Sequence, residues 1–249
     1  MKKLCNILCV GLFSIFLLAG TAMALPFGGI ANGGDALQAV LDGITVGGPS
    51  SVDVYTDFLV DGNDAYWMQT ATGGSVATMI VELASFKDTN IFGVYSGGQY
   101  VELFGGSANA GDQALLSIKA DGSVFVNFAD SGVDFAGNNF GFYLDSTAEA
   151  RGGVSHSDTT LNSDGLDHMY AYRGQNDVVQ LPGYFPGTWT DNEWIFAFED
   201  LFDNPDWDHT DFVVMVESVQ PVPEPATMLL LGVGLVGLGA ARRKRITSK

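Results

Sequence analysis

The 249-residue sequence predicts an all-β protein, an antiparallel β-sandwich or jelly-roll-like domain with one short N-terminal helix. Short apolar runs rich in β-branched and aromatic residues recur from residue 51 onward, and Gly, Asn and Asp separate them. Two of the gaps carry hairpin signals. No helical segments alternate with these runs and no fixed-period repeat is evident, which argues against a parallel sheet, a solenoid and a propeller.

The helix signal precedes the strands. In residues 33–44, GGDALQAVLDGI, Asp35 suits the N-cap, and Leu37, Val40 and Leu41 follow at the spacing of one helix face. The apolar runs predict strands at residues 51–60, 65–70, 76–84, 91–95, 100–104, 115–119, 123–128, 140–144, 168–173, 194–198 and 212–219.

The hairpin signals lie at two glycine-containing turns. Asp121-Gly122, between two alternating runs, predicts a type I′ turn with positive φ at both residues. Gly97-Gly98 predicts a second hairpin.

The N-terminal segment is expected to direct export rather than to join the fold. Residues 1–24 begin with two lysines after Met1, continue as a short apolar run and close on Ala22-Met23-Ala24, which is typical of a secretory signal peptide with an A-x-A cleavage site. Both cysteines, Cys5 and Cys9, lie in this segment. The mature chain is therefore expected to have no thiol that could form a disulfide, bind a metal or act as a nucleophile. Between the two end segments, a single domain is expected over residues 25–221.

The C-terminal segment, residues 222–249, has three parts. Pro223-Glu224-Pro225 is followed by an uncharged, glycine-rich stretch at 226–241 and then by the bases Arg242, Arg243, Lys244 and Arg245. The stretch is short for a transmembrane helix, but flanking arginines can lengthen a span, and the positive cluster favours a cytoplasmic C-terminus.

These three parts, in this order, resemble the PEP-CTERM sorting signal of Gram-negative bacteria. The resemblance implies recognition by an exosortase-type membrane enzyme, cleavage near the Pro-Glu-Pro motif and only transient anchoring in the inner membrane. It further implies secretion, to the cell surface or into an exopolysaccharide matrix.

The charge of the central domain narrows the classes of partner. All but one of the 29 Asp and Glu residues lie within residues 25–221, where the bases are Lys87, Lys119, Arg151 and Arg173. Such a domain repels nucleic acid and anionic lipid, so neither is an expected partner. It attracts divalent cations, although high net charge is also ordinary for a secreted protein.

The most acidic stretch is FEDLFDNPDWDHTDF, residues 198–212. Hard cations such as Ca²⁺ take six to eight oxygen ligands, so a short acidic loop after a strand is a candidate site. An EF-hand is excluded, because Asp211 stands where the turn needs Gly and because residues 212–216 predict a strand, to which Glu217 then belongs. The alternative is that the acids accept backbone N–H groups in turns. Both interpretations remain open for Glu199, Asp200, Asp206, Asp208 and Asp211.

The same stretch resembles the terminal signature of the domain of unknown function 4114. The likeness rests on FEDL at 198–201, the three spaced aspartates and the Val-rich run after them. NIFGVY (90–95), FGFYL (140–144) and LNSDGLDHMYAY (161–172) extend it over about residues 86–219. It implies a β-sandwich in a surface or secreted protein. His209 and Thr210 stand where the family pattern has an aromatic residue and Asn; Thr210 keeps an oxygen, whereas His209 is a poor Ca²⁺ ligand, and the acidic residues of the pattern are retained.

A second polar cluster at residues 156–169 has the ligand types of a transition-metal site. We favour a turn before a strand there, because the cluster lacks a regular ligand spacing such as H-E-x-x-H. Its candidate ligands are His156, Asp158, Asp164, Asp167 and His168.

Catalysis has little support in the sequence. Glu199 and Asp200 are adjacent, and neighbours on a strand point to opposite faces. Nucleophile-elbow, phosphate-loop and dinucleotide motifs do not occur in the sequence. We expect a non-enzymatic structural or adhesive protein of the polysaccharide matrix, with Ca²⁺ as the candidate ion. The alternatives are a carbohydrate-binding module with Trp189 and Trp207 as candidate stacking residues, and, less favoured, a polysaccharide-active hydrolase.

Overall fold

The structure, a computed structural model, describes residues 27–81, 88–222 and 234. The expected signal peptide (1–24), the Pro-Glu-Pro motif (223–225), the apolar stretch (226–241, except Gly234) and the basic cluster (242–245) lie outside the described residues. Among the residues that are described, no helix has the length and hydropathy needed to cross a membrane.

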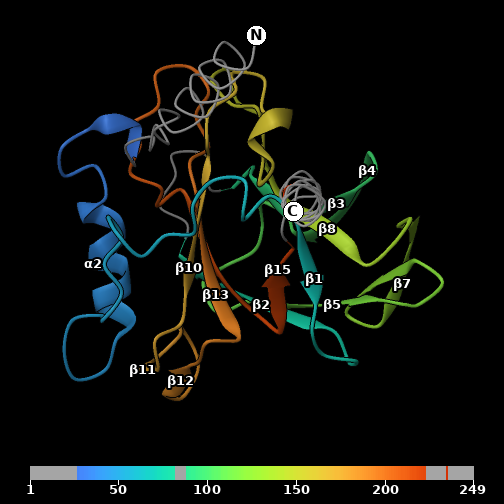
Figure 1. Cartoon of the computed structure of the whole chain (residues 1–249), viewed down its shortest axis with the longest axis horizontal. Helices are drawn as coiled ribbons and strands as arrows, with labels where there is room; N and C mark the ends of the chain where they lie inside the picture. The colour runs from blue at the N-terminus through green and yellow to red at the C-terminus, as the bar shows by residue number, and fades with distance from the viewer. Residues whose placement is uncertain (1–26, 82–87, 223–233, 235–249) are drawn as a thin grey trace, which may run out of the picture.

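Two antiparallel sheets face each other and form the body of the domain (Figure 1). The first has the order β15-β1-β8-β3-β4, with β9 also paired to β8. Its strands are β15 (Val219–Pro221), β1 (Trp67–Gln69), β8 (Asn139–Asp145), β3 (Ile91–Ser96), β4 (Gln99–Phe104) and β9 (Val154–His156).

The second sheet has the order β10-β13-β14-β2-β5-β6-β7. Its strands are β10 (Met169–Arg173), β13 (Glu193–Phe198), β14 (Phe212–Glu217), β2 (Ser75–Val81), β5 (Gln113–Ile118), β6 (Ser123–Val126) and β7 (Ala129–Asp134). A separate ribbon pairs β11 (Asp177–Val179) with β12 (Gly187–Trp189). All of these pairs are antiparallel, which confirms the predicted β-rich, antiparallel architecture.

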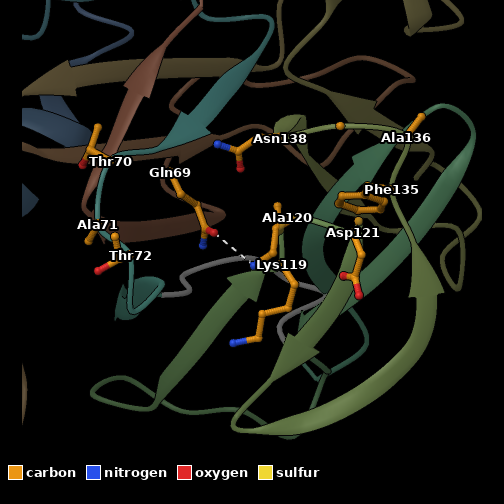
Figure 2. A pocket seen from close by; sticks show the side chains of 13 residues that line it. Gln69, Thr70, Ala71, Thr72, Lys119, Ala120, Asp121, Phe135, Ala136 and Asn138 are labelled. Atoms are coloured by element: carbon orange, nitrogen blue, oxygen red, sulfur yellow. Dashed lines mark hydrogen bonds between the residues drawn. The ribbon is translucent and has the colours of Figure 1, made fainter.

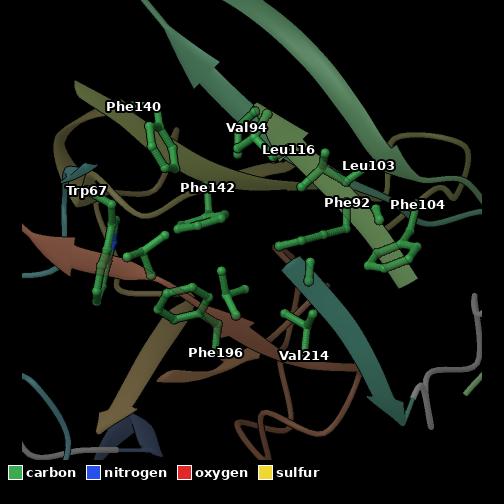
Figure 3. Close-up of a cluster of buried hydrophobic side chains, with 14 of the residues drawn as sticks. Trp67, Phe92, Val94, Leu103, Phe104, Leu116, Phe140, Phe142, Phe196 and Val214 are labelled. Carbon is green, nitrogen blue, oxygen red and sulfur yellow. The ribbon is translucent and has the colours of Figure 1, made fainter. Parts of the chain in front are cut away.

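Aromatic side chains fill the space between the two sheets (Figure 3). Phe142 of β8 lies 4.5 Å, centroid to centroid, from Phe196 of β13, and Trp67 of β1 lies 4.8 Å from Phe196. Phe92 of β3 stacks on Phe212 of β14 at 4.9 Å. Burying one such ring contributes on the order of 1.5–3 kcal/mol, so this layer contributes substantially to the stability of the described domain.

The second sheet is also covered on its outer face. Residues of β13 alternate between the two clusters: Phe196 faces the first sheet, while Ile195 and Ala197 join a second cluster with α2 (Asp35–Ile44). Figure 1 shows α2 beside β10, along this face. The N-terminal segment completes the cover, because Phe27 is buried and its N–H donates to the Tyr170 hydroxyl (3.0 Å).

Several expectations about single elements are corrected. The helix is confirmed, but Asp35 is its first residue; Gly34 is the N-cap and there is no side-chain cap. Residues 51–60 do not form a strand, apart from a single bridge between Phe58 and Tyr172. They form turns against α2, where the Gln38 side chain binds the backbone of Val52 (3.1 Å) and Val54 (3.0 Å). Local hydrogen bonds to a helix side chain thus replace a strand ladder.

Both predicted hairpins form, but one turn differs in type. Gly97 and Gly98 have φ values of 58° and 81°, as a two-residue primed turn between β3 and β4 requires. At the β5–β6 hairpin only Gly122 has positive φ (97°), and its N–H donates to Lys119 O (2.9 Å). This is a type I turn followed by a left-handed glycine rather than the expected type I′ turn.

The predicted strand at 212–219 is two strands. β14 ends at Glu217, Ser218 has a φ of 59°, and β15 begins at Val219. β14 lies in the second sheet and β15 in the first, so the chain crosses between the sheets at Ser218. The Ser218 carbonyl accepts the Thr70 N–H (2.9 Å) and the Ser75 hydroxyl (3.0 Å) on either side of the crossing.

Candidate functional site

The acidic stretch forms the connection between β13 and β14, which are neighbours in the second sheet. Phe198 pairs with Phe212, so residues 199–211 form a loop at one end of two core strands. The acids therefore begin where β13 ends, as the sequence predicts. Glu217 is the last residue of β14, which confirms its place in a strand. We call residues 199–211 the acidic loop.

The backbone of the acidic loop is bound to the segment at residues 146–153. Arg151 donates three hydrogen bonds to loop carbonyls, from Nε and Nη2 to Asp203 O (2.9 and 2.7 Å) and from Nη2 to Asn204 O (2.6 Å). The Ser146 hydroxyl donates to Asp200 O (2.7 Å). Gly152 bridges to Leu201 at a point where any Cβ would lie 1.9 Å from Ser146 O. The loop is thus held in place independently of its carboxylates.

The carboxylates converge in two groups that share one residue. Glu199, Asp200 and Asp211 offer ligand atoms within 4.8 Å of one another, and Asp211 offers one within the same distance of Asp206 and Asp208. Glu199 and Asp200 are 0% and 1% exposed, whereas Asp206 is exposed. All five residues named from the sequence are therefore brought together, with Asp211 at the centre.

Some of these carboxylate oxygens bind the backbone of the loop. Glu199 accepts the N–H groups of Leu201 (3.1 Å) and Trp207 (2.8 Å) through its two oxygens. Asp211 Oδ2 accepts the Asp200 N–H (3.0 Å), and Asp208 Oδ1 accepts both the N–H (2.9 Å) and the hydroxyl (2.8 Å) of Thr210. The turn-forming interpretation is thus correct for these oxygens. The Asp206 carboxylate, Asp208 Oδ2 and Asp211 Oδ1 make no hydrogen bond with the residues described here and remain available as ligands.

Burial and the crowding of like charges raise the pKa values of carboxylates in the acidic loop. Burial, then the charge of Asp211, raises the pKa of Glu199 to about 9. Burial, then the charge of Asp200, raises the pKa of Asp211 to about 8. Burial also raises the pKa of Asp200, although a hydrogen bond from Asn90 opposes the shift. The ion pairs within the described ranges are His168–Asp164 and Arg173–Asp191, so no base within 4.0 Å neutralises the acidic loop there.

Asn90 supports this site and is not apparent as a site residue in the sequence. It lies directly before β3 and is 2% exposed. Its Nδ2 donates to Asp200 Oδ2 (3.0 Å), while its Oδ1 is buried without a hydrogen-bond partner in the described part of the chain. An unpaired acceptor beside a carboxylate has the polarity that a cation would satisfy. Sequence spacing cannot indicate such a residue, because it lies 110 positions away from its partner.

The second polar cluster does not assemble as one metal site. His168 Nε2 contacts Asp164 Oδ2 (2.9 Å) and its ring stacks on Phe202, whereas His156 Nε2 contacts the Tyr100 hydroxyl (2.8 Å). These residues are absent from the groups of three convergent metal-ligating side chains found among the described residues. Asp158 instead caps the short helix η3 (Thr159–Leu161) by accepting the Thr160 N–H (3.0 Å). The structure therefore fits the interpretation of residues 156–169 as a turn before a strand.

The two tryptophans named for glycan stacking are not open platforms. Trp189 is 1% exposed, and its Nε1 donates to Glu193 O (3.0 Å). Trp207 is partly buried beside His168 and His209. The large exposed aromatics that are described include Phe185 (95% exposed) and Tyr184 (40%), both in the loop between β11 and β12.

A polar hollow of about 360 Å³ lies at the turn between β5 and β6 (Figure 2). Its aromatic wall residue, Phe135, is 3% exposed. Gln69 is already bound to the backbone, because it accepts the Ile118 N–H (3.0 Å) and donates to Leu116 O (2.8 Å). The hollow therefore offers polar groups but no aromatic surface for a sugar ring.

Comparison with known proteins concerns the C-terminal end of the chain. No curated protein matches the chain. Residues 221–245 match the family model of the PEP-CTERM protein-sorting motif. The match begins at Pro221, the last residue of β15, so the motif starts where the sheet ends. The motif implies an exported protein with a membrane-anchored C-terminal sorting tail, processed by an exosortase-type enzyme.

Proposed function

We propose that this chain is a non-enzymatic extracellular protein of the polysaccharide matrix, in which the β-sandwich domain has a structural or adhesive role and Ca²⁺ stiffens the acidic loop. The sorting motif carries the extracellular part of this proposal. Because the motif begins at the last residue of β15, cleavage near Pro223-Glu224-Pro225 would release the folded domain without trimming its sheet.

The contacts of the acidic loop support the role of Ca²⁺. Five carboxylates converge at the acidic loop, and no base of the described residues lies within 4.0 Å of them, although the charge of Arg151 opposes the rise that burial causes in the pKa of Asp200. Carboxylate oxygens are the ligands that Ca²⁺ prefers, and the buried, unpaired Asn90 Oδ1 belongs to a side chain bound to Asp200. The backbone of the loop is already fixed by Arg151 and Ser146, so binding would order few additional residues. The likeness of residues 86–219 to the domain of unknown function 4114 belongs to this proposal, since FEDL and the three spaced aspartates fall on the acidic loop.

The burial of the adjacent acids supports a non-catalytic role. Glu199 and Asp200 are 0% and 1% exposed and are engaged with the loop backbone and Asn90. A pair of catalytic carboxylates must face one substrate bond from two sides. Turnover of the matrix polysaccharide by the purified protein would contradict this part of the proposal.

Sorting is tested in the producing cells by replacing Pro223, Glu224 and Pro225 with Ala. We expect the variant to stay uncleaved in the membrane fraction, while the wild-type chain is shortened and released. Replacing Ile246, Thr247 and Ser248 with Ala, beyond the matched residues, is the control and should leave processing unchanged. Normal release of the triple variant at the motif would refute the sorting assignment.

Calcium binding is tested by thermal unfolding of the full chain in detergent, with millimolar CaCl₂ or with chelator. A ligand that binds only the folded state raises the midpoint by mass action. An unchanged midpoint at millimolar Ca²⁺ would remove the calcium part and leave the sorting part intact.

A carbohydrate-binding module is the second candidate, and the exposed pair Tyr184 and Phe185 favours it. Aromatic rings at a loop tip can stack on sugar rings, and these two rings are more exposed than Trp189 and Trp207. Pull-down with matrix polysaccharide should fall on Phe185→Ala and stay unchanged on Trp189→Phe. Equal retention of both variants would count against this alternative.

A further inference from the structure

Two turns of the same sequence pattern face one hollow, outside the acidic loop. Residues 61–64 are Asp-Gly-Asn-Asp and residues 164–167 are Asp-Gly-Leu-Asp. Each has a left-handed glycine, Gly62 (φ 84°) and Gly165 (φ 69°). Both glycines line a hollow of about 260 Å³, together with residues of η3. The pattern places one acid at each end of both turns.

Three of the four acids at the turn ends have partners. Asp61 Oδ1 accepts the Thr159 hydroxyl (2.7 Å), Asp164 Oδ2 contacts His168, and Asp167 Oδ1 accepts the Met169 N–H (3.1 Å). Asp64 differs. It is 1% exposed, and neither of its carboxylate oxygens has a hydrogen-bond partner among the residues that the structure describes. A carboxylate buried in this way is strongly disfavoured unless a proton or a cation accompanies it.

The position of Asp64 is fixed by the core rather than by its own side chain. Its carbonyl accepts Nε1 of Trp67, which is 0% exposed in the layer between the sheets (2.6 Å). The backbone N–H groups of Gly62 and Asp64 lie near the carboxylate and favour its charge, but neither meets hydrogen-bond geometry. The backbone of Asp64 is therefore anchored to the core at the start of β1, while its carboxylate takes no part in that anchoring.

The surroundings of Asp64 are acidic. Burial, then the charges of Asp167 and Asp61, raises the pKa of Asp64, and burial, then the charge of Asp61, raises the pKa of Asp167 to about 7. His209, packed on Tyr170, does not offset this charge, because burial lowers its pKa to about 3. No Lys or Arg among the described residues pairs with these acids.

We propose that the turns at residues 61–64 and 164–167 form a binding site for a hard divalent cation of the Ca²⁺ type, with Asp64 as its central ligand and Asp61 and Asp167 completing it. Both oxygens of Asp64 then gain the partner they lack. The donors are all oxygens, which selects Ca²⁺ over Zn²⁺ or Cu²⁺. The carboxylates of the three acids do not converge within 4.8 Å as those of the acidic loop do, so binding requires the exposed Asp61 to move toward the ion or to contact it through a water molecule.

Binding of this ion ties two distant parts of the chain together. The first turn leads into β1 of the first sheet, and the second leads into β10 at the edge of the second sheet. A cation between them closes the end of the sandwich at which η3 lies. This site shares no residue with the acidic loop, so its existence does not depend on the proposed function.

The test is a count of bound Ca²⁺ by calorimetric titration of the full chain in detergent, using four variants. Asp64→Asn removes the central charge, and Asp61→Asn removes an exposed ligand with little risk to folding. Asp211→Asn removes the shared ligand of the acidic loop. Asp134→Asn, an exposed acid of β7, is the matched control. We expect two equivalents for the wild type and for Asp134→Asn, one for Asp64→Asn, and at least tenfold weaker binding at one site for Asp61→Asn.

Each outcome separates the two sites. Loss of one equivalent in Asp64→Asn and of the other in Asp211→Asn supports both. The site at Asp64 is overturned, and the acidic loop is kept, if the wild type binds a single equivalent of Ca²⁺ that is lost in Asp211→Asn. That equivalent would persist in Asp64→Asn and Asp61→Asn. The reverse pattern keeps the site at Asp64 and removes the acidic loop, and absence of any binding overturns both. If Asp64→Asn fails to fold, Asp61→Asn alone decides, and unchanged affinity in it overturns the inference.

Discussion

Replacement of Asp211 by Asn should stabilise the chain in chelator and abolish the stabilisation by Ca²⁺ at the acidic loop. Asp211 is shared by both groups of the acidic loop, and Asn keeps its size and one oxygen to accept the Asp200 N–H. The pKa of Asp211 is raised to about 8 in the folded chain, above its ordinary value of 3.8. The folded state thus holds a proton that the unfolded state has lost, and stability in chelator falls as pH rises from about 4 to about 8.

The size of the effect follows from this shift. One pKa unit corresponds to about 1.4 kcal/mol, so the rise from 3.8 to about 8 sets an upper limit of about 6 kcal/mol at pH 8.5. Partial exposure and relaxation of the loop reduce this to roughly 1–3 kcal/mol. Asn never ionises, and the variant in chelator should therefore melt about 3–10 °C above the wild type at pH 8.5. Ca²⁺ at a hundredfold excess over its dissociation constant stabilises the wild type by about 2.7 kcal/mol and leaves the variant unaffected at this loop.

The assay is thermal unfolding followed by circular dichroism at pH 6.0 and 8.5, in CaCl₂ and in chelator. Asp203→Asn is the matched control, since Asp203 is exposed in the same loop and contacts Arg151 through its backbone carbonyl and N–H rather than through its carboxylate. The control should respond to Ca²⁺ like the wild type. Equal Ca²⁺ responses of Asp211→Asn and the wild type, or a variant less stable than the wild type in chelator at pH 8.5, would refute the reasoning.

Three further predictions concern pH, the support of the loop and the core. Because protons and Ca²⁺ compete for Glu199, whose pKa is raised to about 9, the rise in melting temperature caused by Ca²⁺ should be larger at pH 8.5 than at pH 5.5; an equal rise would place the ion elsewhere. Arg151→Ala should lower the free energy of unfolding in urea by about 1–3 kcal/mol and expose residues 199–211 to proteolysis, because three loop hydrogen bonds are lost. The control, Arg173→Ala, breaks an exposed ion pair and should lower the free energy of unfolding by under about 1 kcal/mol. Equal losses in the two variants would contradict the supporting role of Arg151. Phe196→Ala should cost about 3–5 kcal/mol through loss of its contacts with Trp67 and Phe142, against about 0.5 kcal/mol or less for the exposed Phe185→Ala; a small effect at Phe196 would show that the aromatic layer is not the core.

Local sequence patterns predicted the elements whose signals lie within a few residues. Gly97-Gly98 predicted its hairpin, because two left-handed residues have few other uses, and the apolar run at 194–198 predicted β13. The acidic loop was predicted to begin where β13 ends, because the acids follow directly on the apolar run of that strand. The prediction of a strand at 51–60 was wrong because the Gln38 side chain, from another element, binds that backbone.

The short strands β7, β9, β11 and β12 lacked a predictive signal. In β7 all residues but Val133 are exposed, so the strand is defined by its pairing with β6 and not by burial. The division of 212–219 into β14 and β15 depends on which sheet each half joins, and that is decided at Ser218 by contacts with Thr70 and Ser75. Such pairings are long-range, and a local pattern does not contain them.

The sequence by itself determined the class of the fold, the sorting motif at residues 221–245 and the identity of the acids in the loop, because periodicity, motif order and spacing are properties of neighbouring residues. Only the tertiary structure decided which acids of the chain have hydrogen-bond partners. Asp208 and Asp211 bind the loop backbone, Asn90 joins Asp200 from 110 positions away, and Asp64 is left buried without a partner. The pKa of a carboxylate and its affinity for a cation depend on the charges and donors around it in space, and folding sets these by joining distant segments.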